Sequence, residues 1–200
     1  MNMYTVKRWT GKWEDIPSLD IAEKYRKTPD TVTARAQIAF DEDNLYVRLE
    51  TEEYEHRNVE TGPIGMPCED SCLEFFFSPV EGDTRYFNIE FNSNCCMYLG
   101  MGHSMDDLVR LIPDEKGADV LSPKVEMKDG GWSIEYTIPV SFVKIFFPYF
   151  SLYAGKRMRA NCYKCADKTE PPHYLSWNPV TTDNFTFHRS ECFGEMIFAN

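Results

Sequence analysis

The 200-residue sequence predicts an all-β protein, an antiparallel β-sandwich of the jelly-roll or immunoglobulin-like kind with one or two short helices. The first observation is that apolar residues recur at every second position in most segments, as in half-buried strands. The second is that short polar or glycine-containing turns separate pairs of such segments, as in hairpins. The third is that helix signals are few and weak. We therefore expect one domain that covers residues 1–200.

The expected strands follow one another in hairpins. An acidic turn, Asp41–Asp43, separates the first two strands. The pair Gly130-Gly131 separates the fifth and sixth, where glycine adopts a positive φ at little cost. Short helices are expected between Pro139 and Pro148 and over residues 18–27. The strands themselves are predicted over residues 31–40, 44–50, 71–79, 85–92, 122–128, 132–139, 156–165 and 194–200.

Charge and composition limit the kinds of partner. The formal net charge is −11, which argues against nucleic acid and anionic membranes, because both bind basic surfaces. No apolar run approaches the ~20 residues that cross a bilayer, and the N-terminal segment lacks the apolar core of a signal peptide. Seven cysteines, an odd number, favour free thiols in a reducing compartment. We therefore expect a cytoplasmic protein, or an extracellular one if a leader has been removed.

Alternation assigns a second, polar face to the central strands. Where Phe87, Ile89 and Phe91 point one way, the intervening side chains point the other way. Planar hydrogen-bonding groups on that face would suit the hydroxyls of a sugar. They would equally suit solvent, with Glu–Arg pairs that contribute little energy, and the pattern alone favours solvent. The polar residues in question are Glu74, Asn88, Glu90, Arg159, Asn161 and Tyr163.

The segment 173–194 carries many aromatic residues for a loop. Trp177 precedes Asn178-Pro179, and its flat ring could stack on the C–H face of a sugar or hold the loop against the sheet. His188 is expected to be a hydrogen-bonded histidine first and a ligand contact second. Tyr174 and Phe193 are expected to anchor the loop.

No arrangement of residues points clearly to catalysis or to a metal. Glu74 and Glu90 could be neighbours on adjacent strands, but a glycosidase needs two carboxylates that flank a water-excluding cleft. Cys162 and Cys165 lie on a predicted strand, where redox chemistry is not expected, and the other cysteines match zinc-site spacings poorly. Buried thiols explain them more simply. We expect no catalytic residue, no metal ligand and no cofactor.

Seven segments follow one another in a recognisable order: FDEDNLYVRLE (40–50), EDSCLEFFFSP (69–79), YFNIEFN (86–92), GWSIEYTIP (131–139), RMRANCYKC (157–165), LSWNP (175–179) and FHRSECFGEMIF (187–198). In this order and spacing the sequence resembles the family 9 carbohydrate-binding modules over most of its length. The resemblance implies a β-sandwich that binds saccharides without catalysis. It also implies that two aromatic rings clamp the terminal sugar while polar side chains hold its hydroxyls.

The resemblance carries over to particular residues. Phe187, in FHRSECFG, matches one clamp position, whereas the other is held by Met66-Pro67-Cys68 and has no aromatic ring. Tyr54 or Trp177 could replace the missing ring. Structural calcium is common in the family, and the acidic turn 41–44 has suitable oxygens, although a solvated hairpin turn is the more usual explanation. The matching polar positions are Glu74, Asn88, Glu90, Arg159 and Asn161.

We therefore predict a lectin-like module of polysaccharide catabolism that binds a mono- or oligosaccharide. Two alternatives remain open: a small glycoside-processing enzyme, and a sandwich interaction domain that has lost sugar binding. Nucleic acid and membranes are not expected as partners. The predicted sugar-binding residues are Trp177, Phe187, Glu74, Asn88, Glu90, Arg159, Asn161, Tyr163 and His188.

Overall fold

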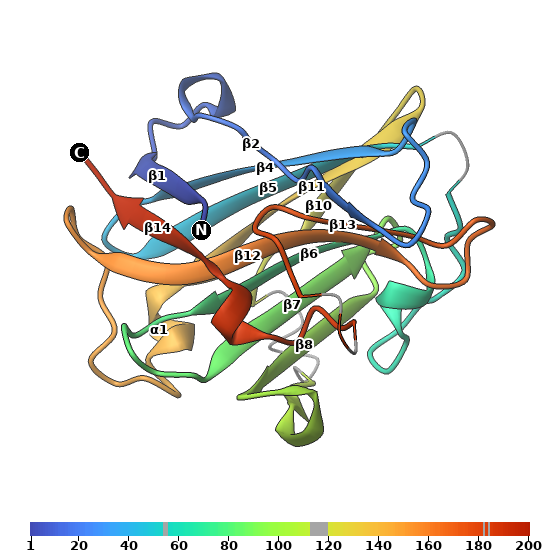
Figure 1. Ribbon diagram of the computed structural model, residues 1–200. Coiled ribbons are helices and arrows are strands. Elements are labelled where there is room, and N and C mark those ends of the chain that lie inside the picture. The colour runs from blue at the N-terminus through green and yellow to red at the C-terminus, as the bar shows by residue number, and fades with distance from the viewer. Residues whose placement is uncertain (54–55, 113–119, 182, 184) are drawn as a thin grey trace.

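The computed structural model describes residues 1–53, 56–112, 120–181, 183 and 185–200, and the chain is mostly β-structure (Figure 1). The all-β prediction is therefore confirmed. In chain order the strands are β1 (Met3–Arg8), β2 (Leu19–Asp20), β3 (Glu23–Tyr25), β4 (Thr33–Phe40), β5 (Asn44–Glu52), β6 (Cys72–Ser78), β7 (Tyr86–Asn92), β8 (Met97–Gly102), β9 (Val109–Arg110), β10 (Lys124–Lys128), β11 (Gly131–Pro139), β12 (Arg157–Ala166), β13 (His173–Ser176) and β14 (Gly194–Phe198).

Helices are short throughout the described residues, and none is long and apolar enough to cross a membrane. α1 (Val140–Val143) follows Pro139, where the sequence predicts a helix. The helix predicted over residues 18–27 is wrong, because Leu19 and Ile21 alternate into the core and the segment forms β2 and β3. The remaining helices are single 3-10 turns: η1 (Trp13–Asp15), η2 (Pro67–Glu69), η3 (Met105–Asp107) and η4 (Ser190–Cys192).

One curled, mixed sheet runs through the described chain in the order β10-β11-β5-β4-β1-β14-β12-β6-β7-β8-β9, with β2, β3 and β13 attached beside it. Most neighbours are antiparallel, as predicted. β1 is the exception, because it pairs in parallel with both β14 and β4. This strand, which the alternation pattern did not identify, joins the two halves of the sheet.

The two halves form layers that share one apolar core (Figure 1). Phe91 of β7 lies 5.1 Å from Tyr136 of β11, measured between ring centroids. Phe40 of β4 similarly meets Phe198 of β14 at 4.9 Å. The alternate apolar residues of strands from both halves therefore point inward, as their period of two requires.

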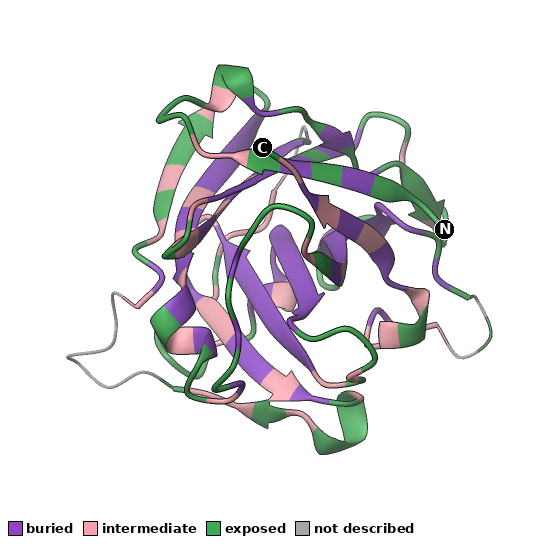
Figure 2. Cartoon of the chain, turned by 90° about the vertical axis from the view of Figure 1, so that its left-hand side faces the viewer, coloured by how far each residue is buried: buried purple, intermediate pink, exposed green. Residues whose placement is uncertain are grey.

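The outer face of β6 and β7 is covered as well, since every residue of these two strands is buried (Figure 2). The cover includes Tyr174, Phe187 and Phe193 from the C-terminal segment, which pack on Phe76 and Tyr163 in a second apolar cluster. The solvated-face interpretation of this surface is therefore wrong. A polar face that is buried has to be satisfied by the protein itself or by a ligand.

The two glycines of the predicted turn are required for different reasons. Gly130 has a φ of +78°, which glycine adopts without strain. Gly131 is needed for space, because a Cβ there would lie 2.1 Å from the carbonyl oxygen of Thr51 on β5. The turn therefore lets β11 approach β5 along its full length, where the two strands pair from Gly131 to Pro139.

Candidate functional site

A row of polar and aromatic residues crosses four adjacent strands on the covered face. Tyr163 of β12 lies opposite Glu74 of β6, Glu74 lies opposite Glu90 of β7, and Glu90 lies opposite Tyr98 of β8. Neighbouring strands are about 4.8 Å apart, so the row places two carboxyl groups side by side with a tyrosine beyond each of them. Asn88 stands two residues before Glu90 on the same face of β7.

Above this row lies a cavity of about 480 Å³, which we call the carboxylate cavity. It combines carboxyl groups, aromatic rings and thiols. Its lining residues are Arg26, Met66, Cys68, Glu74, Asn88, Glu90, Tyr98, Met105, Leu108, Cys165, Asp167, Tyr174, Phe185, Thr186, Phe187 and His188.

One wall of the carboxylate cavity is aromatic. The Phe187 ring stacks on Tyr163 with 4.2 Å between centroids and an interplanar angle of 18°. Phe185 and Tyr174 meet Phe187 edge to face, and the guanidinium of Arg26 lies 4.8 Å from the ring centroids of both. This packing holds the Phe187 ring rigidly beside the carboxyl row.

The floor of the cavity holds carboxyl groups in an environment that favours their neutral form. Burial, followed by the nearby charge of Glu90, raises the pKa of Glu74 well above its usual value. Burial also raises the pKa of Glu90 to about 7, although a hydrogen bond from Asn88 opposes the shift. At neutral pH the pair therefore keeps at least one proton, and it can both donate and accept hydrogen bonds.

Two acceptors at this floor are buried without a hydrogen-bond partner among the described residues. They are Oε2 of Glu90 and Oδ1 of Asn88. The amide of Asn88 donates to the other Glu90 oxygen, Oε1, at 2.9 Å, which fixes the orientation of both side chains. A buried polar atom without a partner costs roughly 1–3 kcal/mol, so this floor suits a ligand that brings hydroxyl donors.

His188 lines the cavity from the C-terminal segment. Its Nδ1 lies 2.9 Å from the hydroxyl of Tyr86, and its ring packs at 5.3 Å from that of Phe76. Burial lowers the pKa of His188 to about 4, so the imidazole is neutral at physiological pH. It lines the cavity as a polar but uncharged group, and it also makes the hydrogen bond that the sequence led us to expect.

The wall opposite Phe187 comes from β8 and the loop before η2. Tyr98 lines this wall, and the guanidinium of Arg110 lies 4.5 Å from its ring centroid. The same guanidinium donates to the carbonyl oxygens of Gly65 at 2.6 Å and Ile64 at 3.1 Å. Met66 and Cys68, from the Met66-Pro67-Cys68 stretch that holds the clamp position without an aromatic ring, therefore line the cavity.

Five predicted site residues meet at the cavity, namely Glu74, Asn88, Glu90, Phe187 and His188. Trp177 does not, because its ring belongs to the main core, packs edge to face against Tyr4 and lies under Gly194. Its predicted role as a sugar platform is therefore wrong. Tyr54, the other suggested substitute, lies outside the described residues.

The remaining predicted residues support the site from behind. Tyr163 is fully buried beneath Phe187 and donates to its carbonyl oxygen at 3.2 Å. Asn161 donates to the carbonyl oxygen of Asn178 at 3.0 Å and accepts from the Asn178 amide at 2.8 Å. Arg159 donates to the carbonyl oxygens of Glu191 and Phe193. Direct ligand contact by Asn161 and Tyr163 is a wrong prediction, because both side chains are fully buried and hold the C-terminal segment. Ligand contact by Arg159, whose Nε has no partner among the described residues, stays a prediction.

Sequence reasoning missed Tyr98, Tyr174 and Phe185 as lining residues. Alternation could have found Tyr98, since the motif MYLGMG places its ring on one face of β8. Tyr174 was assigned to anchoring, and it lines the cavity as well. Nothing in a single sequence pairs Tyr98 with Glu90, because that register depends on the tertiary fold.

Two other features of the molecule lie apart from this site. A cavity of about 530 Å³ lies beside residues 146–157, but none of the predicted site residues lines it. In the acidic turn, where structural calcium stays a prediction, Oδ1 of Asp41 accepts from the amides of Asp43 and Asn44. Its Oδ2 accepts from Tyr46. The turn is therefore explained by its own hydrogen bonds.

Comparisons with known proteins agree with this fold. The family model for carbohydrate-binding family 9 matches residues 12–198. A putative carbohydrate-binding protein from Bacteroides uniformis ATCC 8492 is similar in structure, with a TM-score of 0.81, 26% sequence identity and 98% coverage of both chains. No curated protein matches the sequence.

A family 9 module from Caldicellulosiruptor kristjanssonii has the same fold at 12% identity. Its structure in complex with glucose gives a TM-score of 0.70, with coverage of 98% of this chain and 95% of that one. Its structure in complex with cellotriose gives 0.71, with 99% and 94% coverage.

Proposed function

The chain belongs to carbohydrate-binding family 9, whose members bind sugars without catalysis, and we propose that it holds a mono- or oligosaccharide in the carboxylate cavity. The observation that carries this proposal is the pair of unpartnered acceptors, Glu90 Oε2 and Asn88 Oδ1, beside a rigid aromatic wall. Sugar hydroxyls supply the donors that these atoms lack, and the apolar face of a sugar ring suits an aromatic side chain.

The row also suggests how a sugar is clamped. Phe187 stands over Tyr163 at one end and Tyr98 stands at the other. Three strand spacings of about 4.8 Å separate Tyr163 from Tyr98, which leaves room for a sugar ring between the two walls. We propose that Tyr98, together with Met66, replaces the ring missing from the loop before η2. Glucose and short β-glucans are the first ligands to test, since the module from C. kristjanssonii was solved with such sugars.

A small glycosidase is the second candidate, because Glu74 and Glu90 are buried, have raised pKa values and form no ion pair among the described residues. Directly opposite residues on paired strands bring their carboxyl groups to roughly the 5 Å separation of a retaining enzyme. Both groups, however, lie on one floor. A ligand resting on that floor is not flanked from two sides, so binding without cleavage is the better-supported function.

Titration calorimetry with glucose, cellobiose and cellotriose tests the proposal directly. We expect saturable binding, and Asn88→Ala should weaken it about three- to tenfold because one hydrogen bond is lost. Asn94→Ala is the matched control, since Asn94 is exposed in the turn after β7. If no sugar of a wider panel binds, the alternative of an interaction domain that has lost sugar binding is favoured. Release of reducing ends would favour the enzyme.

We further infer the finer fold class and the setting. The two layers that share one core support a single β-sandwich domain of jelly-roll or immunoglobulin-like type. All seven cysteines are free thiols in the structure, which supports a reducing, cytoplasmic location. Mass spectrometry with a thiol-labelling reagent on freshly purified protein would test the second inference.

A further inference from the structure

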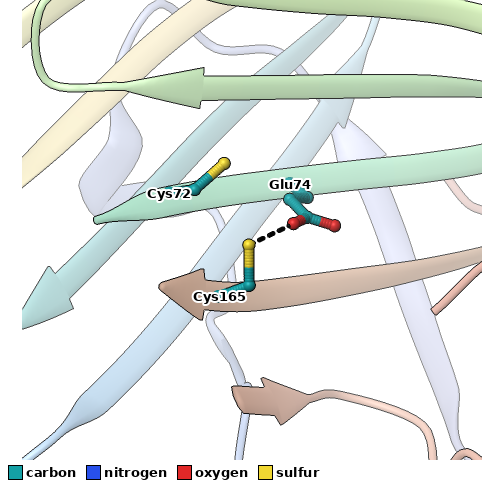
Figure 3. A group of neighbouring side chains, drawn as sticks. All are labelled: Cys72, Glu74 and Cys165. Atoms are coloured by element: carbon teal, nitrogen blue, oxygen red, sulfur yellow. Dashed lines mark hydrogen bonds between the residues drawn. The ribbon is translucent and has the colours of Figure 1, made fainter. Parts of the chain in front are cut away.

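Two thiols and a carboxyl group lie close together on the neighbouring strands β6 and β12 (Figure 3). One ligand atom from each of Cys72, Glu74 and Cys165 lies within 4.8 Å of the other two. Cys72 and Cys165 are paired in register across β6 and β12, and Glu74 follows two positions after Cys72 on the same face. The Cys165 side chain points toward Glu74, and its Sγ lies 2.7 Å from Oε1.

The two sulfur atoms and one carboxylate of this group favour some metal ions over others. Calcium and magnesium require oxygen ligands, whereas two cysteine sulfurs with one carboxylate suit a thiophilic ion such as Zn²⁺. Packing of small thiols would explain the cysteines alone, since both belong to the second apolar cluster. It does not explain Glu74, a buried carboxyl group whose hydrogen bond in the structure comes from a thiol.

The carboxylate cavity gives an ion a way to reach these ligands. Glu74 and Cys165 line the cavity, so an ion held by them would be reached from it. The lining also carries Asp167 and the guanidinium of Arg26.

We propose that Cys72, Glu74 and Cys165 form a three-ligand site for a Zn²⁺-type ion, with the fourth position open to the carboxylate cavity. Three protein ligands and one open position are the arrangement that zinc adopts where it also binds water or a ligand. The strands β6 and β12 hold all three side chains, so the site is preorganised. The proposal does not depend on sugar binding, because the ligands and the open position exist with or without a sugar.

Cobalt(II) is the probe for this site, because tetrahedral Co²⁺ bound to thiolates absorbs in the visible and gives a sulfur-to-metal band in the near ultraviolet. We expect one Co²⁺ per chain, displaced by Zn²⁺. Cys165→Ser and Cys72→Ser should each weaken binding at least tenfold and reduce the sulfur band. Cys95→Ser is the matched control, since Cys95 is an exposed thiol, and it should leave both readouts unchanged.

Glu74→Gln keeps the test decisive if a cysteine variant does not fold. It should weaken Co²⁺ binding while the sulfur band persists at saturating metal, because both thiolates remain. Less than one ion per chain, the absence of a sulfur band, or an equal loss in Cys95→Ser would overturn the proposal. Sugar titrations in the presence and absence of Zn²⁺ measure sugar affinity independently of the metal readout, so failure of one proposal can be told from failure of the other.

Discussion

Phe187 and Trp177 lie in one C-terminal segment and are almost equally buried, at 8% and 6% exposure, yet they belong to different parts of the molecule. Phe187 is in the second apolar cluster and borders the carboxylate cavity, whereas Trp177 is in the main core. Exposure alone therefore does not identify a ligand-binding ring. What distinguishes the two is the face of the sheet on which each one packs.

Replacing Phe187 by alanine should weaken sugar binding about tenfold or more, since burial of one aromatic ring contributes roughly 1.5–3 kcal/mol. Calorimetry with the best-binding sugar measures the change. Tyr149→Ala serves as the control, because Tyr149 is 99% exposed at the other cavity. Unchanged affinity in Phe187→Ala would show that the aromatic wall has been assigned incorrectly.

Glu90 should make the folded protein less stable as the pH rises. Its pKa is raised in the folded state from about 4.5 to about 7. As the pH rises, the unfolded chain therefore releases this proton at a lower pH than the folded chain does. Between the two pKa values the folded chain binds more protons than the unfolded chain. The free energy of unfolding should fall by at most about 1.4 kcal/mol per pH unit between pH 5 and 7 and level off above that.

Urea unfolding of chelator-treated protein at several pH values measures this slope, with Glu90→Gln as the comparison. The amide does not titrate, so the variant should show a flatter profile across the same interval. An identical slope in both proteins would mean that another group is responsible.

At the scale of elements, β12 supports the site more than it contacts a ligand. Its outward side chains Arg159, Asn161 and Tyr163 each hydrogen-bond to the backbone of the segment 178–193. β8 has the opposite role, because it supplies Tyr98 directly to the cavity. The predicted polar face is thus divided between strands that form the cavity floor and a strand that holds its cover.

Asn161→Ala tests this division. It removes three hydrogen bonds, including one accepted from the Cys162 amide at 3.0 Å, and leaves buried backbone groups unpaired. We expect a loss of about 2–4 kcal/mol in the free energy of unfolding. The loss in sugar affinity should be smaller than that of Phe187→Ala. A variant of wild-type stability that fails to bind sugar would place Asn161 in the site after all.

At the scale of the whole molecule, a buried polar network joins the two halves of the sheet. Glu53 follows β5, and its Oε2 lies 3.1 Å from Nζ of Lys164 on β12 and 3.2 Å from Nε2 of His173 on β13. Trp132 of β11 donates to the same carboxylate at 3.1 Å. Burial opposes ionisation of Glu53, but Lys164, His173 and Ser71 outweigh it and lower the pKa to about 2.

Lys164→Met should cost about 3–5 kcal/mol in the free energy of unfolding, because it leaves a buried carboxylate without its cation. Lys168→Met is the matched control, since the exposed Lys168 pairs with the half-buried Glu69 at 2.6 Å, and it should cost less than about 1 kcal/mol. Because the pKa of Glu53 is lowered, its contribution should be present above about pH 4.5 and disappear as the pH falls toward 2. Equal losses in the two variants would contradict this account.

The sequence by itself determined the all-β class and the family. It also determined the alternation that places Glu74, Asn88 and Glu90 on one face. These follow from local rules, because a period of two assigns each side chain to a face without knowledge of the neighbouring strand.

The tertiary structure alone decided what that face does. The parallel pairing of β1 joins the two halves of the sheet. The C-terminal segment covers β6 and β7, so a face that patterning assigns to solvent becomes a buried floor. The register between strands brings Tyr98 to Glu90 and Cys165 to Cys72. Such contacts join residues far apart in the chain, and their energies depend on packing that no local pattern records.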